Sequence, residues 1–536
     1  FTANCRPLRN RAGFEFVPAA DRHLRVFSDT GFYHHQVEWC YQIPYPVEQS
    51  RGMTASGDAC SPGWFELPLP SGGSATLTAS ADPADPDPVW VKDFLPRRTR
   101  SNELALQRAG LHLNDAFGRQ LVLAIQAYVA RRNGGKTVVA GYPWFLDWGR
   151  DSLICARGML AAGMTDDIKQ LLVTFGRFEQ DGTLPNSIHG ENASNRDTSD
   201  APLWFGLAVE EAAALMGPDL YLTPVDPSGR TLADVLRRIA AGYCRGTFNG
   251  VRVDPGSGLV WSPSHFTWMD TNFPAGTPRE GYPVEIQALW IRLLRQLDRL
   301  EAGAAGKDFC IQGTQMTEGT QGTSGESWRT LADRAELNLE KFFWLEDQGY
   351  LADVLEARPG VSAAVAPPDR AVRSNCLLAV SLGLVSGEKA QRCVETAQRY
   401  LAVPGALRSL APLKVWTPHP IRGNDGRLLN DPGFPYWGRY EGDEDTRRKP
   451  AYHNGTAWTW TFAVFCEALA KAWNFSTEAT AAAKAYLRSL EPLLVSGCLG
   501  HLPEILDGDA PHTQRGCDAQ AWSATEALRV WKLLSA

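Results

Sequence analysis

Twelve segments with a helical pattern of apolar residues make up most of the chain and restrict its possible folds. From about Ser101 onward, apolar residues recur at intervals of three and four, which predicts amphipathic helices. These segments lie near residues 114–132, 150–162, 165–178, 199–216, 229–248, 281–303, 325–345, 372–384, 386–401, 452–473, 476–493 and 518–534. Twelve successive helices suit a ring of six hairpins, so we predict a mainly α protein, an (α/α)6 toroid. A helical solenoid has the same helix count, but the sequence shows no fixed repeat.

The first hundred residues have a different pattern. Polar and apolar residues alternate in RVFSDTGFYHHQVEWCYQIPY and in GWFELPLPSGGSATLTAS, which predicts half-buried strands. Prolines alternate with aspartates over Asp82–Pro88, which predicts a boundary loop. We therefore divide the chain into a β-rich segment over 1–95, a linker over 96–112 and a helical domain over 113–536.

Composition excludes several kinds of partner. The formal net charge is -7, so no basic excess is present to hold a nucleic acid. The longest apolar stretches, such as Leu121–Ala130, are too short to cross a membrane. The 11 cysteines have neither metal-binding nor disulfide spacing, so we expect free thiols in the cytoplasm and no metal or other cofactor. The 18 tryptophans suit a neutral, polyhydroxylated ligand, although core packing would account for any one of them.

The segment AGYPWFLDWGRDSLICARG, at 140–158, concentrates groups that bind sugars. It places Trp144, Asp147, Trp148, Arg150 and Asp151 just before or at the start of a predicted helix. Arginine and carboxylate groups can hydrogen-bond to vicinal hydroxyls while an indole stacks on the sugar ring. A helix cap with a paired arginine is the alternative, because carboxylates are favoured at helix starts.

This segment closely resembles the motif that opens the amylo-α-1,6-glucosidase part of the glycogen debranching enzymes. Segments that resemble the family's other motifs follow in the same order, at 182–205, 266–290, 406–412, 452–460 and 501–523. Residues 38–67 resemble the end of the β-sandwich that precedes the barrel in bacterial members. The resemblance implies an (α/α)6-barrel glycoside hydrolase related to the glucoamylases, of the bacterial type without a glucanotransferase barrel.

The resemblance also implies roles for residues at the helix starts. Arg150 and Asp151 would hold the terminal glucose. Inverting hydrolysis needs a general acid and a general base across the sugar, with their carboxyl groups roughly 6.5–9.5 Å apart. In TSDAPLWF, Asp200 is the candidate acid, and Trp204 is expected to line the site. The alternatives are that Asp200 is a plain helix cap and that Asp197 is the acid.

Glu504 in LPEIL is the candidate base, because it is a lone carboxylate between apolar residues. Its rivals, Asp507 and Asp509, lie in a polar turn and look like solvated loop residues.

Further candidates lie in the motifs at 266–290 and 452–460. Trp268 and Asp270 are expected to line the glucose subsite, unless they only structure a loop. Arg279 is expected to bind a carboxylate or a hydroxyl, and Glu285 either orients Arg279 or is a core residue. His453 is expected to bind a hydroxyl or to cap a helix.

We therefore predict a glycoside hydrolase that releases glucose from the non-reducing end of an α-glucan by inversion. The expected substrate is an α-1,6-linked glucosyl stub of glycogen or limit dextrin. The alternatives are a glucoamylase-like or trehalase-like hydrolase and a catalytically silent glucan-binding protein. The sequence does not indicate an oligomeric state.

Overall fold

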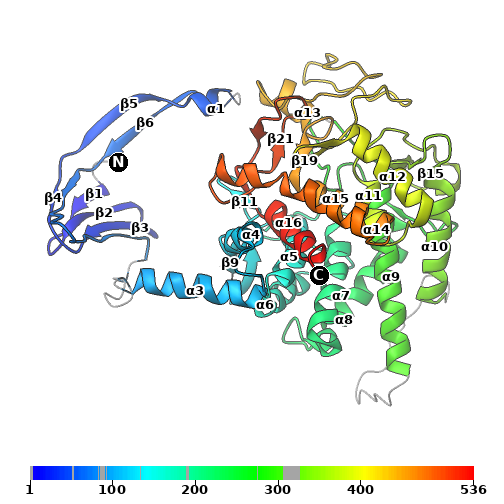
Figure 1. Cartoon of the computed structure of the whole chain (residues 1–536), viewed down its shortest axis with the longest axis horizontal. Helices are drawn as coiled ribbons and strands as arrows, with labels where there is room; N and C mark the ends of the chain where they lie inside the picture. Colours follow the sequence, from blue (N-terminus) through cyan, green and yellow to red (C-terminus); the bar gives the residue numbers. More distant parts are fainter. Residues whose placement is uncertain are drawn as a thin grey trace. The chain divides into compact units, whose positions relative to one another are not determined.

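The computed structural model describes residues 4–50, 53–82, 84, 91, 93–132, 134–188, 192–274, 276–305 and 326–536. The chain forms two units, shown in Figure 1. One comprises Phe1–Leu104 with Glu441–Glu444, and the other comprises Ala105–Tyr440 with Asp445–Ala536. Most of the predicted boundary loop, Asp82–Pro88, lies outside the described residues.

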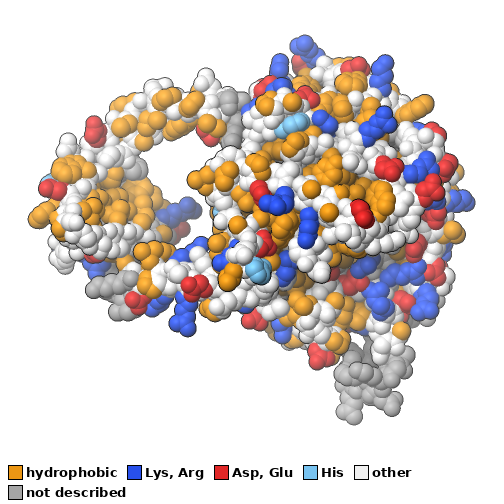
Figure 2. All heavy atoms as spheres, in the orientation of Figure 1, with side chains coloured by type: hydrophobic (Ala, Val, Ile, Leu, Met, Phe, Trp, Pro, Cys, Tyr) orange, Lys and Arg blue, Asp and Glu red, His pale blue; other side chains and the backbone are white. Residues whose placement is uncertain are grey.

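The first unit is rich in β-strands, as the alternating pattern predicts. Four antiparallel strands form a sheet in the order β1-β2-β3-β8, with bounds Cys5–Pro7, Ala12–Ala19, Arg22–Ser28 and Leu77–Ser80. Two further antiparallel pairs are β4 with β7 (Phe32–His34, Trp64–Glu66) and β5 with β6 (Glu38–Pro44, Ser56–Ser61), and the short helix α1 (Pro46–Ser50) follows β5. Figure 2 shows hydrophobic side chains gathered over this unit, where Leu24, Phe32 and Leu77 are exposed.

A helix occupies most of the segment that we predicted as a linker. This helix, α3, spans Phe94–Ala109. Within it only Ala105 and Ala109 are buried, one turn apart. Because only this narrow stripe is buried, the segment shows little apolar periodicity, and its sequence resembles that of a linker.

The second unit contains a helix in each of the twelve predicted segments. Their bounds are α4 Ala116–Gln126, α5 Gly149–Ala161, α6 Thr165–Arg177, α7 Ala201–Met216, α8 Leu232–Arg245, α9 Val284–Ala305, α10 Trp328–Phe343, α11 Cys376–Ser381, α12 Gly387–Tyr400, α14 Thr459–Ala472, α15 Thr477–Arg488 and α16 Ala521–Leu533. The first helix is shorter than predicted, because residues after Gln126 turn into a hairpin of β9 (Val129–Arg132) and β10 (Gly135–Val138). A one-turn helix, α13 (Lys449–Tyr452), was not predicted.

Six of these helices contact one another in a cycle, and we call them the inner helices. The contacts run from α5 to α7, α9, α11, α14 and α16, and α16 returns to α5. The other six helices pack on them. Burial agrees with this arrangement: α5 buries every residue of 149–159, whereas α12 buries only Ala390, Cys393, Val394 and Ala397, on one face.

Short strands connect the segments that precede the inner helices. β20 (Ala457–Trp458) leads directly into α14 and pairs with β21 (Ile505–Leu506). β23 (Ala519–Gln520) leads into α16 and pairs with β11 (Gly141–Tyr142). These pairings bring segments that are distant in the sequence, such as Gly141 and Gln520, to the same end of the inner helices.

A close approach between two inner helices allows a direct test of the packing. A Cβ on Gly158 of α5 would lie 2.2 Å from the backbone oxygen of Thr525 in α16. Because backbone cannot move aside as a side chain can, we expect Gly158→Ala to lower the free energy of unfolding by about 1–3 kcal/mol. Urea unfolding measures this change.

Gly303→Ala is the matched control, because nothing lies within 4 Å of a Cβ added to this glycine of α9. It should leave the stability unchanged or raise it by up to about 1 kcal/mol. Equal stability of the two variants would contradict the packing of α5 on α16.

Candidate active site

A buried arginine joins three segments at the start of the inner helices. Arg150 lies in the first turn of α5 and is 2% exposed. Its Nε donates to Asp200 Oδ2 at 2.6 Å, and its Nη1 donates to Asp270 Oδ2 at 2.9 Å. The cap position of α5 is held by Trp148, so Arg150 and Asp151 are not a simple capping pair. The Asp270 side chain remains 31% exposed, which opens this cluster to solvent on one side.

Asp200 holds the cap position of α7, but its side chain makes no capping hydrogen bond. Its Oδ1 accepts from the Thr198 hydroxyl at 2.7 Å, and its Oδ2 accepts from Arg150. Thr198 does the capping, since its hydroxyl oxygen accepts from the Ala201 N–H. Asp200 is buried, whereas Asp197 is exposed. The carboxylate of Asp200 is therefore the one that faces Arg150.

Glu504 is held at both carboxylate oxygens. Oε1 accepts from the Tyr452 hydroxyl, and Oε2 accepts from the Cys517 N–H at 2.8 Å. A Cβ on Gly516, whose φ is +67°, would lie 2.3 Å from Oε2, so glycine permits this close approach. Burial raises the pKa of Glu504 to about 7, against the two hydrogen bonds, which lower it, and with Asp270, which raises it further.

Asp151 is a second carboxyl group with a raised pKa. Burial raises its pKa to about 8, while the Arg150 guanidinium opposes this change. The charges of Asp270, Glu504 and Asp200 raise the pKa of Asp151 further, in that order. Groups that hold and release protons near neutral pH are thus gathered around one arginine, as acid–base catalysis requires.

Aromatic rings form a buried box beside these carboxylates. The Trp268 ring lies edge-on to the rings of His453, Trp458 and Trp460, at centroid distances of 5.4, 5.0 and 5.2 Å. Trp460 also stacks on Trp522 at 5.2 Å. Trp204 lies edge-on to Trp460 at 6.5 Å. Such rings offer flat apolar surfaces of the kind that suits the C–H faces of sugars.

Several buried polar atoms in this region have no hydrogen-bond partner among the described residues. They are Arg150 Nη2, Trp460 Nε1, Trp522 Nε1 and both ring nitrogens of His453. Burial and the neighbouring Arg373 and Arg150 lower the pKa of His453 well below its usual value, so its imidazole is neutral and can both donate and accept. Leaving such groups unpaired costs free energy, so this set fits a ligand with several hydroxyl groups.

Two of the predicted sugar-binding residues are bonded to other protein groups. The Asp147 carboxylate accepts from Arg132 Nη1 at 2.6 Å and from the Thr137 hydroxyl. The Arg279 guanidinium is held by Glu285 and Asp353, with Nη2 to Glu285 Oε2 at 2.6 Å. Glu285 is bonded to Arg279 and is also buried, so both roles considered for it remain open.

The two tryptophans of the first motif lie at the edge of the site. Trp148 is half-buried at the cap of α5, and Trp144 is 39% exposed. The Trp144 backbone hydrogen-bonds to Cys517, whose own N–H binds Glu504. Trp144 is thus an exposed residue that is connected to Glu504 through Cys517.

Asp507 corrects one of our expectations. We expected a solvated turn residue, but Asp507 is buried and paired with Arg515 Nη2 at 3.0 Å. It also accepts from the Tyr440 N–H, so it fixes two loops to each other. Asp509 accepts from the Tyr436 hydroxyl at 2.9 Å. The sequence did not indicate this burial, because Arg515, the partner of Asp507, lies eight residues further on and outside the turn.

Tyr452, which bonds to Glu504, is a residue of the candidate site that sequence reasoning missed. It belongs to the YHNGTAWTW segment, but nothing in that segment indicates a bond to a glutamate 52 residues away. The described residues contain no group of three or more His, Cys, Asp or Glu that could hold a metal ion. Likewise, no helix in the described ranges is long and apolar enough to cross a membrane.

Carboxyl groups that hold protons near pH 7, beside an aromatic box with unpaired donors, are typical of a glycoside hydrolase. Comparison with known families agrees. The family model described as amylo-alpha-1,6-glucosidase matches residues 116–529, and the model described as glycogen debranching enzyme N terminal matches residues 3–76. The chain belongs to the amylo-alpha-1,6-glucosidase family and is a glycoside hydrolase.

The individual relatives have low sequence identity to this chain. The glycogen debranching enzyme of Saccharomyces cerevisiae is 24% identical over 408 residues, which cover 62% of this chain and 25% of the yeast protein. The chain thus spans about a quarter of the length of that curated relative. Among solved structures, a glycosidase in complex with glucose has 16% identity and a TM-score of 0.49, with 82% of this chain and 97% of that one covered. The neutral trehalase of Saccharomyces cerevisiae has 14% identity and a TM-score of 0.47, with 75% and 76% covered.

The raised pKa of Glu504 has a consequence for stability that needs no substrate. Above about pH 4.5 the unfolded chain releases a proton that the folded protein keeps until about pH 7. The free energy of unfolding therefore falls as the pH rises between these values, by about 3 kcal/mol for this group. We expect Glu504→Gln to match the wild type at pH 5 and to exceed it in stability at pH 8, as measured by urea unfolding.

Glu395→Gln is the control, since Glu395 is an exposed residue of α12. It should change the stability by the same small amount at both pH values. If Glu504→Gln behaves in the same way as this control, then Glu504 does not hold a proton at neutral pH.

Proposed function

We propose that this chain is an exo-acting amylo-α-1,6-glucosidase that removes single α-1,6-linked glucosyl stubs from glycogen or limit dextrin. The observation that carries the proposal is the set of unpaired, buried polar atoms in an aromatic box beside Asp200 and Glu504. Family membership supports the choice of substrate. A box with Trp204, Trp460 and Trp522 in its wall suits one terminal sugar rather than the middle of a chain.

The inner and surrounding helices form an (α/α)6 toroid in this proposal. The closed cycle of contacts among the inner helices supports it, as does the packing of one further helix set around them. The substrate enters at the end where the inner helices begin, which is also where Asp270 is partly exposed. A cytoplasmic location suits the ten described cysteines, all of which are free thiols.

In the proposed reaction, polar groups hold the terminal glucose while the glycosidic bond is cut. Arg150 Nη2, His453 and the indole N–H groups of Trp460 and Trp522 bind hydroxyls, because each is buried without a partner among the described residues. Trp268 offers a ring edge to the same space. These contacts require hydroxyl groups on the bound ring and select for a sugar.

Asp200 is the general acid and Glu504 the general base of the proposed mechanism. Asp200 gives its proton to the glycosidic oxygen as the bond to the anomeric carbon breaks. Arg150, 2.6 Å away, then stabilises the aspartate anion that is left. Glu504 takes a proton from the water that attacks the opposite face of the anomeric carbon, and glucose leaves with inverted configuration.

The substrate assignment is tested by measuring free glucose from three substrates in parallel. We expect release mainly from a dextrin that bears single α-1,6-glucosyl stubs, and much less from linear maltooligosaccharide or trehalose. Predominant release from either of the last two would replace the debranching assignment with a glucoamylase-like or trehalase-like activity. Glucose from none of the three would favour a glucan-binding role without catalysis.

The roles of the two carboxyl groups are tested by the pH dependence of kcat/KM. A base must be ionised, so activity should rise with pH through about 7, the pKa of Glu504. Tyr452→Phe removes a hydrogen bond that stabilises the carboxylate, so it should move this limb to higher pH by roughly one unit.

Tyr486→Phe is the control. Tyr486 is in α15, and its hydroxyl bonds to Gln398 of α12, away from Glu504. Its profile should match the wild type. A limb near pH 7 that falls as the pH rises would instead make Glu504 the acid and reverse the two roles.

A further inference from the structure

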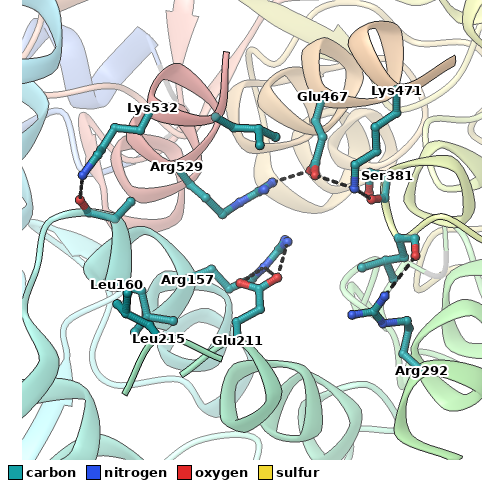
Figure 3. A pocket seen from close by; sticks show the side chains of 13 residues that line it. Arg157, Leu160, Glu211, Leu215, Arg292, Ser381, Glu467, Lys471, Arg529 and Lys532 are labelled. Atoms are coloured by element: carbon teal, nitrogen blue, oxygen red, sulfur yellow. Dashed lines mark hydrogen bonds and ion pairs between the residues drawn. The ribbon is translucent and has the colours of Figure 1, made fainter. Parts of the chain in front are cut away.

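A cavity of about 470 Å³ lies at the other end of the inner helices from the candidate active site. Arg150 is in the first turn of α5, and Arg157 lines the cavity two turns further along the same helix. In α16, the cavity is lined by Arg529 and Lys532, near the last residue of the helix. From Arg150 to Arg157 the helix rises about 10 Å, so the cavity begins two turns beyond the arginine cluster. Figure 3 shows the lining side chains projecting from several inner helices around the space.

The cavity wall carries more positive than negative side chains. Its cations are Arg157, Arg292, Lys471, Arg529 and Lys532, and its carboxylates are Glu211 and Glu467. Two carboxylates outside the wall, Glu210 and Glu526, also bond to these cations. Even when both are counted, the five cations exceed the carboxylates by one. Glu210 is moreover shared with Arg299, which lies outside the wall.

Lys532 and Arg292 are incompletely paired with carboxylates. Lys532 Nζ donates to the backbone oxygens of Ala109 and Ala161, at 2.6 and 2.7 Å, and has no carboxylate partner among the described residues. Desolvation lowers the pKa of Lys532, as expected for an ammonium group without a counter-ion. Arg292 shares Glu210 with another arginine, and its side chain is 34% exposed.

The C-terminal ends of helices repel anions, but here cationic side chains bind the carbonyl groups at these ends. The last carbonyl groups of an α-helix carry a partial negative charge. Lys532 binds the Ala161 oxygen at the end of α5, Lys471 binds the Ser381 oxygen at the end of α11, and Arg292 approaches the Leu382 oxygen next to it. Lys532, Lys471 and Arg292 therefore offset the partial negative charge of these helix ends.

We propose that this cavity binds a small phosphate-bearing molecule. Guanidinium and ammonium groups from different helices suit a phosphate, which accepts several charge-assisted hydrogen bonds. Leu160, Leu215, Leu382 and Leu533 also line the cavity and offer apolar surface to an organic part of the ligand. Because the wall consists of packed helices, the site is formed before the ligand arrives.

Isothermal titration of the whole chain with inorganic phosphate, and separately with glucose 6-phosphate, tests this proposal at constant ionic strength. We expect saturable binding of one equivalent of at least one of the two, and the tighter one identifies the ligand as free or organic phosphate. Arg292→Gln should weaken binding by about tenfold, the effect of one lost charge-assisted bond. Lys532→Gln should weaken it similarly.

Arg299→Gln is the matched control, because Arg299 is on the same helix and bonds to the same Glu210 but does not line the cavity. It should bind phosphate as the wild type does, and so should Glu504→Gln, whose change lies at the catalytic end. The proposal is overturned if neither ligand binds saturably. It is overturned equally if Arg299→Gln weakens binding as much as Arg292→Gln, or if Glu504→Gln abolishes it.

Discussion

The arrangement at the start of the inner helices depends on one buried guanidinium. Removing Arg150 from water is costly, and its bonds to Asp200 and Asp270 offset that cost only while the three groups keep their places. The pairing therefore fixes the start of α5 against the start of α7 and against the loop that carries Asp270. It leaves the buried Nη2 without a hydrogen-bond partner among the described residues. Glu504 accepts hydrogen bonds from Tyr452 and Cys517, and its charge raises the pKa of Asp151, the neighbour of Arg150.

The two ends of the inner helices carry opposite chemistry, and helix polarity explains why. Helix starts favour negative groups and helix ends favour positive groups. Asp151 and Asp200 accordingly lie at the starts of α5 and α7, while Lys471 and Lys532 lie at the ends of α14 and α16. The same set of parallel helices thus places proton-holding carboxyl groups at one end and a positively lined cavity at the other.

The helices could be predicted from the sequence because apolar periodicity is a local pattern. Candidate site residues could also be named, but the residues to which they bond could not. Arg150, Asp200 and Asp270 were all candidates, but nothing local shows that they bond across 50 and 120 residues. Tyr452 escaped notice for the same reason, and so did the burial of Asp507. Helix α3 was missed because only two of its residues are buried, which leaves too little periodicity to detect.

The central claim is that Asp200 and Glu504 act on opposite faces of one sugar. The anomeric form of the glucose that is first released tests this claim most directly, and proton NMR recorded during the first minutes of hydrolysis of α-1,6-stubbed dextrin shows it before mutarotation mixes the forms. The account predicts β-glucose, because water attacks opposite the leaving oxygen. Initial release of α-glucose would mean a covalent intermediate and retention, and would contradict the assignment of an acid and a base on either side of the bond.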